Sequence, residues 1–170
     1  MNTYRCRECQ NEVSTEAKSC PYCGAPNPSK IEQKGSGFEW KSSKTFYGYP
    51  LVHIAFGRDE KHKLRVAKGI VAIGQFGVGL ITFAQFGVGI LFGLGQFILG
   101  ASAIAQFAIS ILFGIGQFST GFVAIGQISL GFYALCQVGH AKHILTPEIK
   151  DPAAIEFFLQ LLERIKRFLT

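Results

Sequence analysis

Charged residues are missing from the middle of this chain. Residues 69–139 contain no Asp, Glu, Lys or Arg, although the 170 residues of the chain include 17 basic and 11 acidic side chains. In an ordinary soluble domain about a quarter of the residues are charged. The absence excludes a monomeric enzyme with a polar surface around its middle. It does not indicate disorder, because Ile, Val, Leu and Phe crowd the same segment and disordered chains are poor in them.

Two further absences narrow the function. The N-terminus has Tyr4, Arg5 and Cys6 where an export signal has a basic start and an apolar core, so we expect no secretory signal. Catalytic groupings are also lacking, because the four histidines have no carboxylate or cysteine at a recognisable catalytic spacing. We therefore expect a protein that is not an enzyme.

Composition divides the chain into four segments. Cysteines mark residues 1–25, and Pro, Gly, Ser and Lys dominate residues 26–50, which we interpret as a linker. Residues 51–146 form an apolar repeat domain, and residues 151–170 carry the pattern of an amphipathic helix. The expected fold class is mainly β, with a small N-terminal zinc ribbon, a Gln-laddered β-solenoid and a C-terminal helix.

Four of the five cysteines form two Cys-x-x-Cys pairs. Cys6 and Cys9 make the first pair, and Cys20 and Cys23 make the second. Two thiolates from each tight turn complete the tetrahedral set of a structural Zn²⁺ and leave no open position for catalysis. Gly24, after the last cysteine, suits a turn that needs a positive φ. Two disulfides are the alternative, which a chain without an export signal disfavours.

Residues 20–25, Cys-Pro-Tyr-Cys-Gly-Ala, are the most typical part of this segment. They resemble the short zinc ribbons found at the N-terminus of many bacterial proteins. The resemblance covers about the first 25 residues and implies one structural zinc ion. Because zinc thiolates require a reducing compartment, we expect the ribbon on the cytosolic side.

Glutamine recurs at steps of 10 or 11 residues through the charge-free segment. The seven positions are Gln75, Gln85, Gln96, Gln106, Gln117, Gln127 and Gln137. The residue before each Gln is small, and the one before that is large and apolar. Residues 90–97 return almost unchanged as residues 111–118, a shift of 21. Alternation with period two predicts strands, and self-similarity at a fixed period predicts a solenoid.

We therefore predict a β-solenoid with 21 residues and two strand runs in each coil, in which glutamines of alternate runs stack as an amide ladder. The zone resembles bacterial repeat proteins with runs of the Ala-Ile-Gly type, which implies architecture only. Three transmembrane helices of ~20 residues are the alternative. We disfavour helices because residues 69–139 contain no polar loop and hold 15 glycines, each of which weakens a helix by about 1 kcal/mol.

The outside of such a solenoid is apolar and must be covered by lipid or by other subunits. At 21 residues per coil, residues 69–139 make about 3.4 coils and stand only about 16 Å tall, so we expect the axis to lie in the membrane plane. Residues 51–68 are expected to form an opening coil whose turn is the charged run 58–63. The basic residues expected to contact the membrane surface are Arg58, Lys61, Lys63, Arg65 and Lys68.

The C-terminal segment predicts a helix that begins with Asp151 as N-cap and Pro152 in the first turn. Its apolar side suits a partner surface or a membrane interface, with packing on its own domain as the alternative. Because basic residues flank the apolar zone on both sides, we expect both chain ends on the cytosolic face.

These features predict a membrane-associated oligomeric scaffold or adaptor in the inner (cytoplasmic) membrane, with the zinc ribbon on the cytosolic side. The expected partners are membrane lipid, further copies of the chain and another protein bound through the ribbon. A soluble solenoid that assembles into filaments is the first alternative. Nucleic-acid binding through the ribbon is a further alternative, which we disfavour because the basic residues lie beside the apolar zone.

Overall fold

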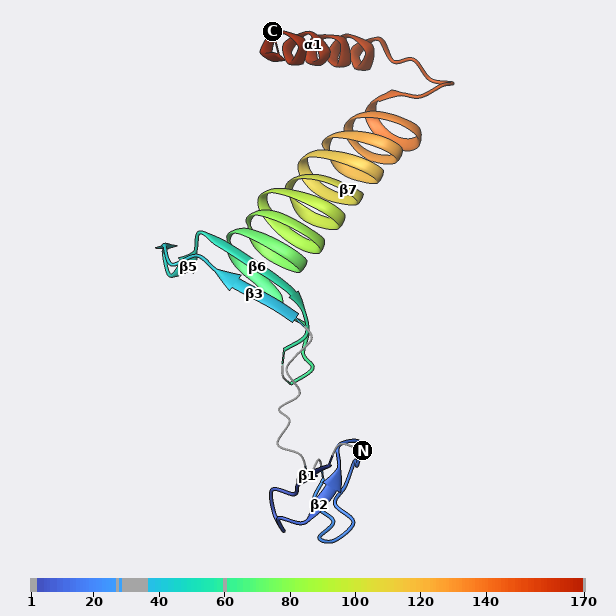
Figure 1. Ribbon diagram of the computed structural model, residues 1–170. Coiled ribbons are helices and arrows are strands. Elements are labelled where there is room, and N and C mark those ends of the chain that lie inside the picture. The colour runs from blue at the N-terminus through green and yellow to red at the C-terminus, as the bar shows by residue number, and fades with distance from the viewer. Residues whose placement is uncertain (1–2, 27, 29–36, 60, 170) are drawn as a thin grey trace.

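The computed structural model describes residues 3–26, 28, 37–59 and 61–169 and is mainly β (Figure 1). The strands are β1 (Thr3–Arg5), β2 (Glu12–Ser14), β3 (Gly37–Lys41), β4 (Thr45–Phe46), β5 (Tyr49–Pro50), β6 (Val52–Gly57) and β7 (Val66–Leu145). One helix, α1 (Pro152–Leu169), follows them. The alternative of three helices is wrong, because the whole charge-free segment lies within strand β7. Among the described residues, no helix is both long and apolar enough to cross a membrane.

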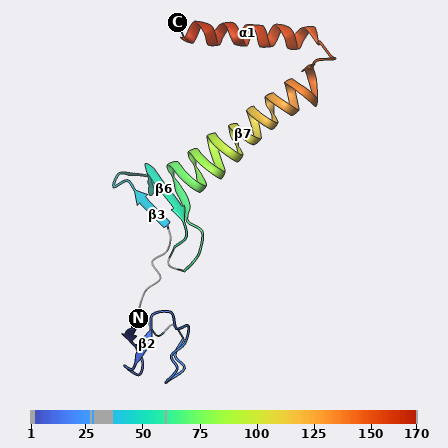
Figure 2. The same cartoon turned by 45° about the vertical axis from the view of Figure 1, so that its right-hand side comes forward.

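Strand β7 winds in successive turns (Figures 1 and 2). From here on, the coil is the whole of β7, and one winding of it is a turn. The length of one turn follows from a column of stacked phenyl rings whose neighbouring centroids are 5.7 to 6.3 Å apart. The column consists of Phe76, Phe86, Phe97, Phe107 and Phe118. Neighbouring turns are therefore 10 or 11 residues apart. The predicted 21-residue turn is wrong.

The 21-residue sequence period is the sum of two turns. Buried positions of the coil recur in pairs that are two residues apart, with three residues to the next pair, so that two pairs make a turn of ten. One extra residue enters between Gly89 and Gly93 and again between Ser110 and Gly114. These two insertions are 21 residues apart and lengthen two of the turns to 11 residues, whereas the turns after Gly114 keep a length of 10. The amino-acid sequence repeats after two turns, whereas the backbone structure repeats after one turn.

The interior of the coil is narrow and holds almost only small side chains. Its buried residues are Ala67, Gly69, Ala72, Gly74, Gly77, Gly79, Thr82, Ala84, Gly89, Gly93, Ile98, Ala103, Ala105, Ala108, Ser110, Gly114, Ser119, Val123, Ala124, Ser129, Ala134 and Cys136. Ile98 is the large inward side chain among them, whereas Val123 does not point inward. Val123 adjoins the inward Ala124 and is buried from outside by α1, with which it forms a cluster. Large side chains therefore point outward.

The two larger inward side chains are matched by glycine across the interior. Thr82 lies half a turn from Gly77 and Gly87, where an added Cβ would come within 2.9 and 2.7 Å of its methyl group. Ile98 lies half a turn from Gly93, and an added Cβ there would overlap the Ile98 side chain. The interior has room for one branched side chain and a glycine, but not for two side chains. Packing at this density makes a single methyl group significant.

The first turn of the coil is covered by β6 and β3. Strand β6 pairs in parallel with residues 71–74 of β7, and β3 pairs antiparallel with β6. Residues 37–50, predicted as part of the linker, therefore form strands β3, β4 and β5, while residues 27 and 29–36 of that linker lie outside the described residues. Asp59 closes the charged run as a turn, because its carboxylate accepts the N–H groups of Lys61 and Lys63 at 2.9 and 2.8 Å.

Helix α1 begins as predicted. The Asp151 carboxylate accepts the N–H of Ala153 at 2.9 Å, and Pro152 is the first helical residue. Ala154 and Phe158 form a buried cluster with Val123, and the Phe157 ring stacks on Tyr133 with centroids 4.0 Å apart. The helix thus lies against the outer side of the last turns (Figure 1). Its other apolar residues remain exposed: Leu159, Leu162, Ile165, Phe168 and Leu169.

The packing across the interior generates a double-mutant prediction. Gly93→Ala should destabilise the coil by about 1–3 kcal/mol through overpacking against Ile98. Ile98→Ala alone should cost about 2–5 kcal/mol because it leaves a cavity. The double variant should lose clearly less than the sum, because the added methyl group then occupies space that Ile98 vacated. Unfolding by urea, followed by circular dichroism, measures the three costs; simple additivity would contradict this packing.

Candidate metal centre

The four-cysteine site is built from two similar turns. The N–H of Gln10 donates to the carbonyl of Cys6, and the N–H of Gly24 donates to the carbonyl of Cys20, both at 2.9 Å. The residue after each second cysteine has a positive φ, 61° at Gln10 and 72° at Gly24. The predicted role of Gly24 is confirmed. Gln10 was not predicted, although its position after Cys9 mirrors that of Gly24.

A short antiparallel pair, β1 with β2, supports these turns. Tyr4 lies opposite Val13 in the pair, and Val13 is buried together with Cys6, Cys20 and Ala25. This cluster is too small to hold the segment together by apolar burial alone, because chains below about 40 residues usually need a metal or disulfides.

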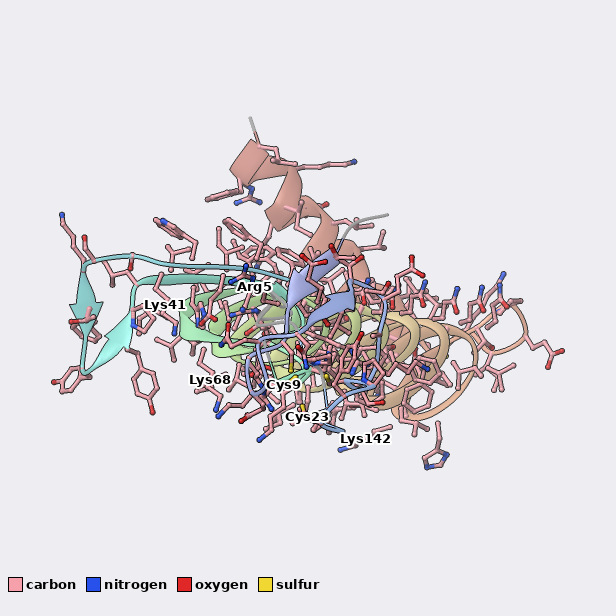
Figure 3. The ribbon with its side chains drawn as sticks, turned by 60° about the horizontal axis from the view of Figure 1, so that its bottom comes forward. Arg5, Cys9, Cys23, Lys41, Lys68 and Lys142 are labelled. Carbon is pink, nitrogen blue, oxygen red and sulfur yellow. The ribbon has the colours of Figure 1, made fainter. Side chains whose placement is uncertain are left out.

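The four sulfur atoms have the geometry of a tetrahedral zinc site. All four lie within 4.8 Å of one another. Sγ of Cys6 is 3.8 Å from Sγ of Cys23, and Sγ of Cys9 is 3.6 Å from Sγ of Cys20. A tetrahedron with Zn–S bonds of ~2.3 Å has edges of about 3.8 Å. The donor set and its spacing therefore suit one structural zinc ion (Cys9 and Cys23 are labelled in Figure 3).

Electrostatics at the site favour a bound cation. The N–H of Cys9 is the main cause that lowers the pKa of Cys6 to about 7. At Cys23 the N–H of Ala25 acts in the same direction, but burial and the three neighbouring thiols outweigh it and raise the pKa to about 12. Four thiolates this close repel one another unless a positive ion lies between them. A divalent ion removes that repulsion and allows all four sulfurs to be thiolates.

The predicted glutamine ladder is placed differently from the prediction. The seven glutamines form one column along the coil, a turn apart, and all except Gln75 are exposed. The amide oxygen of Gln75 accepts the N–H of Gly57 at 3.3 Å. Within residues 66–145, all of which are described, no hydrogen bond joins two of these side chains. The amides point away from the interior and are available to an external partner.

The five basic residues expected at the membrane surface lie around the start of the coil. Arg65 is ion-paired with Glu39, and Arg58 donates to the carbonyl of His62 at 3.0 Å. Lys61, Lys63 and Lys68 are exposed (Lys68 is labelled in Figure 3). Three of the five side chains are therefore available to an anionic surface, and Arg65 has a structural contact instead.

A polar cluster at the start of the coil was not predicted. His53 is buried, and its Nδ1 accepts the N–H of Lys68 at 2.7 Å. Its Nε2 lies 3.2 Å from Oε1 of Glu39. Lys41, 2.8 Å from the Glu39 carboxylate, is the main cause that lowers the pKa of Glu39, with help from His53 and Arg65. The cluster ties β3, β6 and β7 together. The sequence feature that could have indicated this cluster is the single carboxylate of Glu39 among basic residues.

An aromatic hairpin, formed by β4 and β5, packs against the first turns of the coil. Phe46, Tyr47 and Tyr49 line an open apolar pocket together with residues of the first turns, including Ile70 and Ile90. Tyr47 is 89% exposed. Tyr and Trp gather at membrane interfaces, and the hairpin and Trp40 lie at the same end of the coil as the basic turn.

The metal site generates a stoichiometry prediction. Native mass spectrometry of the full chain should find one zinc ion, and Cys20→Ser should lose it together with the fold of the ribbon, because metal binding and folding are coupled in such sites. Cys136→Ala is the matched control, because Cys136 is buried in the coil, and it should retain one zinc ion. Two disulfides without metal would contradict the site.

Comparison with known families supports the metal centre. Residues 5–27 match the zinc-ribbon domain, and all four cysteines fall within the match. No curated protein sequence and no solved structure matches the chain. The N-terminal segment is thus a zinc-ribbon domain with its four cysteines positioned to bind a structural zinc ion, as the sequence predicted.

Proposed function

We propose that this protein is a non-enzymatic, membrane-associated oligomeric scaffold or adaptor, in which a β-solenoid is embedded in lipid and the zinc ribbon contacts a partner in the cytosol. The observation that carries the proposal is the outer surface of the coil. Large apolar side chains cover it, and no charged residue interrupts residues 69–139. Such a surface is far larger than the apolar patches that soluble monomers expose.

The exposed large apolar side chains follow the coil over its whole length. They are Val66, Val78, Phe83, Phe86, Ile90, Leu91, Leu94, Phe97, Leu99, Ile104, Phe107, Ile111, Leu112, Phe122, Ile128, Leu130, Leu135 and Val138. The backbone of each inner turn is paired with the turns on either side, so lipid would meet unpaired backbone groups only at the two ends. The first end is covered by β6 and β3.

The expected orientation of the coil axis in the membrane changes, because each turn is shorter than predicted and the coil therefore has more turns. At about 10.5 residues and ~4.8 Å per turn, residues 69–139 make about seven turns and are about 32 Å long, close to the ~30 Å of a hydrocarbon core. Length alone therefore no longer excludes an axis that crosses the membrane.

Helix α1 favours an axis in the membrane plane. It packs on the side of the last turns through Phe158 and Val123, and Glu163, Arg164 and Arg167 lie farther along it. A crossing axis would bring these charges beside the hydrocarbon, at about 2.5–3.5 kcal/mol for each charged residue. With the axis in the plane, the charged side of α1 lies at the water boundary. The exposed apolar residues of α1 and the basic residues Lys166 and Arg167 near its end suit an interface.

Membrane extraction tests the proposed function. The full chain should sediment with membranes, remain there in high salt and be released by mild detergent as an oligomer, because lipid covers apolar surface that salt does not solvate. Protease added from the cytosolic side should reach both chain ends.

A matched variant separates lipid contact from charge attraction. Lys61→Gln together with Lys63→Gln should weaken binding of the purified chain to anionic vesicles but leave its salt resistance in cell membranes unchanged. Release of the wild-type chain by salt alone, as a soluble assembly, would reject the membrane proposal in favour of filaments in which other copies cover the coil.

A further inference from the structure

We propose that two copies of this chain associate along one edge of the coil, which we call the Gln–Phe edge. Its two neighbouring columns are the seven glutamines Gln75, Gln85, Gln96, Gln106, Gln117, Gln127 and Gln137 and the five stacked rings of Phe76, Phe86, Phe97, Phe107 and Phe118. The inference deepens the proposed oligomeric function by naming the surface and the occupant: a second copy of the chain.

Two consecutive side chains point outward at the Gln–Phe edge, as they also do at the opposite edge, for example at Ile90 and Leu91. Gln96 and Phe97, for example, lie between Gly95 and the fully buried Ile98. Five residues make half a turn, so Leu91 and Leu112 lie on the opposite edge from Gln96 and Gln117. The coil is thus a flattened rod whose edges differ in one respect: the Gln–Phe edge carries amides beside its stacked rings, whereas the opposite edge carries aliphatic side chains and, near its end, the stacked rings of Phe122 and Phe132.

Two of the chain's own elements pack against the ends of the opposite edge. Near the start of the coil, the aromatic hairpin of β4 and β5 forms a pocket with Ile70, Leu80 and Ile90. Near the end, α1 packs against Val123 and Tyr133. Neither the hairpin nor α1 contributes a residue to a cluster or pocket with the Gln–Phe edge among the described residues. The middle of the opposite edge, including Leu91, Ile111 and Leu112, is exposed as well, but these side chains are apolar; the Gln–Phe edge differs because it exposes amide groups.

Exposed amides in an apolar surface need a hydrogen-bonding partner. Each Gln side chain has two donors and a carbonyl acceptor, and from Gln85 to Gln137 the structure pairs none of them with another described residue. In lipid an amide without a partner costs several kcal/mol, and lipid tails offer no hydrogen bonds. In lipid, the glutamine amides therefore need a partner that brings both hydrogen-bond donors and acceptors to this edge.

A second copy provides these groups at matching intervals. Successive glutamines are one turn apart, so both copies repeat their amides at the same ~4.8 Å pitch, and alignment of one pair aligns the others. The amide is its own complement, because it donates and accepts. The column is also nearly symmetric about Gln106, with three glutamines on each side, at steps of 10, 11 and 10 before it and 11, 10 and 10 after it. A two-fold dimer therefore pairs every glutamine.

Cysteine cross-linking tests the edge directly. Because Gln106 is the middle of the seven glutamines, both a parallel and an antiparallel two-fold place it opposite itself. Gln106→Cys in a Cys136→Ala background, with the zinc ribbon loaded, should form a covalent dimer with a short bis-maleimide in native membranes. Leu91→Cys on the opposite edge is the matched control and should give no more dimer than the background chain.

A second measurement separates the amides from the apolar contacts. Gln96→Leu, Gln106→Leu and Gln117→Leu together should weaken the dimer in detergent about tenfold, whereas Leu91→Ala with Leu112→Ala should leave it unchanged. Equal cross-linking at Leu91→Cys and Gln106→Cys, or an unchanged dimer in the triple variant, overturns the inference. If the chain stays in membranes but fails these tests, the proposed membrane function stands and the dimer interface is rejected. If salt releases the chain and Gln106→Cys still cross-links, the dimer interface stands and the membrane function is rejected.

Discussion

The width of the coil is the constraint on which the rest of the structure depends. Ten or eleven residues in a turn leave two short runs face to face, and the gap between them admits Ala, Gly, Ser and little else. Ile98 fits because Gly93 lies opposite. Large apolar side chains cannot enter such an interior and must point outward. An apolar exterior is therefore a consequence of a narrow interior, and not a separate feature of the sequence.

Because the large apolar residues lie on the outside of the coil, the flanking elements have apolar surface and end-turn backbone to cover. Strand β6 pairs with the backbone of the first turn and β3 pairs with β6, and His53, bonded to Glu39 and to the N–H of Lys68, joins both strands to the coil. At the other end α1 covers Val123 and leaves its own apolar side exposed. These elements cover a small part of the apolar surface. The remainder needs lipid or further copies of the chain, which is why the proposed function concerns place and assembly.

The zinc ribbon follows a separate logic. Its fold depends on four sulfur atoms at tetrahedral spacing and on two turns that close with a positive φ, and not on a large core. This is why a segment of about 25 residues identifies itself by spacing alone.

The sequence by itself determined the zinc ligands, the strand character of the middle and the start of the last helix, because each depends on neighbours in the chain: two cysteines in a turn, alternation of large and small residues, and Asp151 before Pro152. Tertiary structure alone decided the length of a turn. The sequence shows a near repeat after 21 residues and glutamines after 10 or 11, but it does not show which interval is one turn; the contact between the rings of Phe76 and Phe86 shows that turns stack every 10 or 11 residues. The same holds for Gln106, whose outward direction follows from which small residues fill the interior.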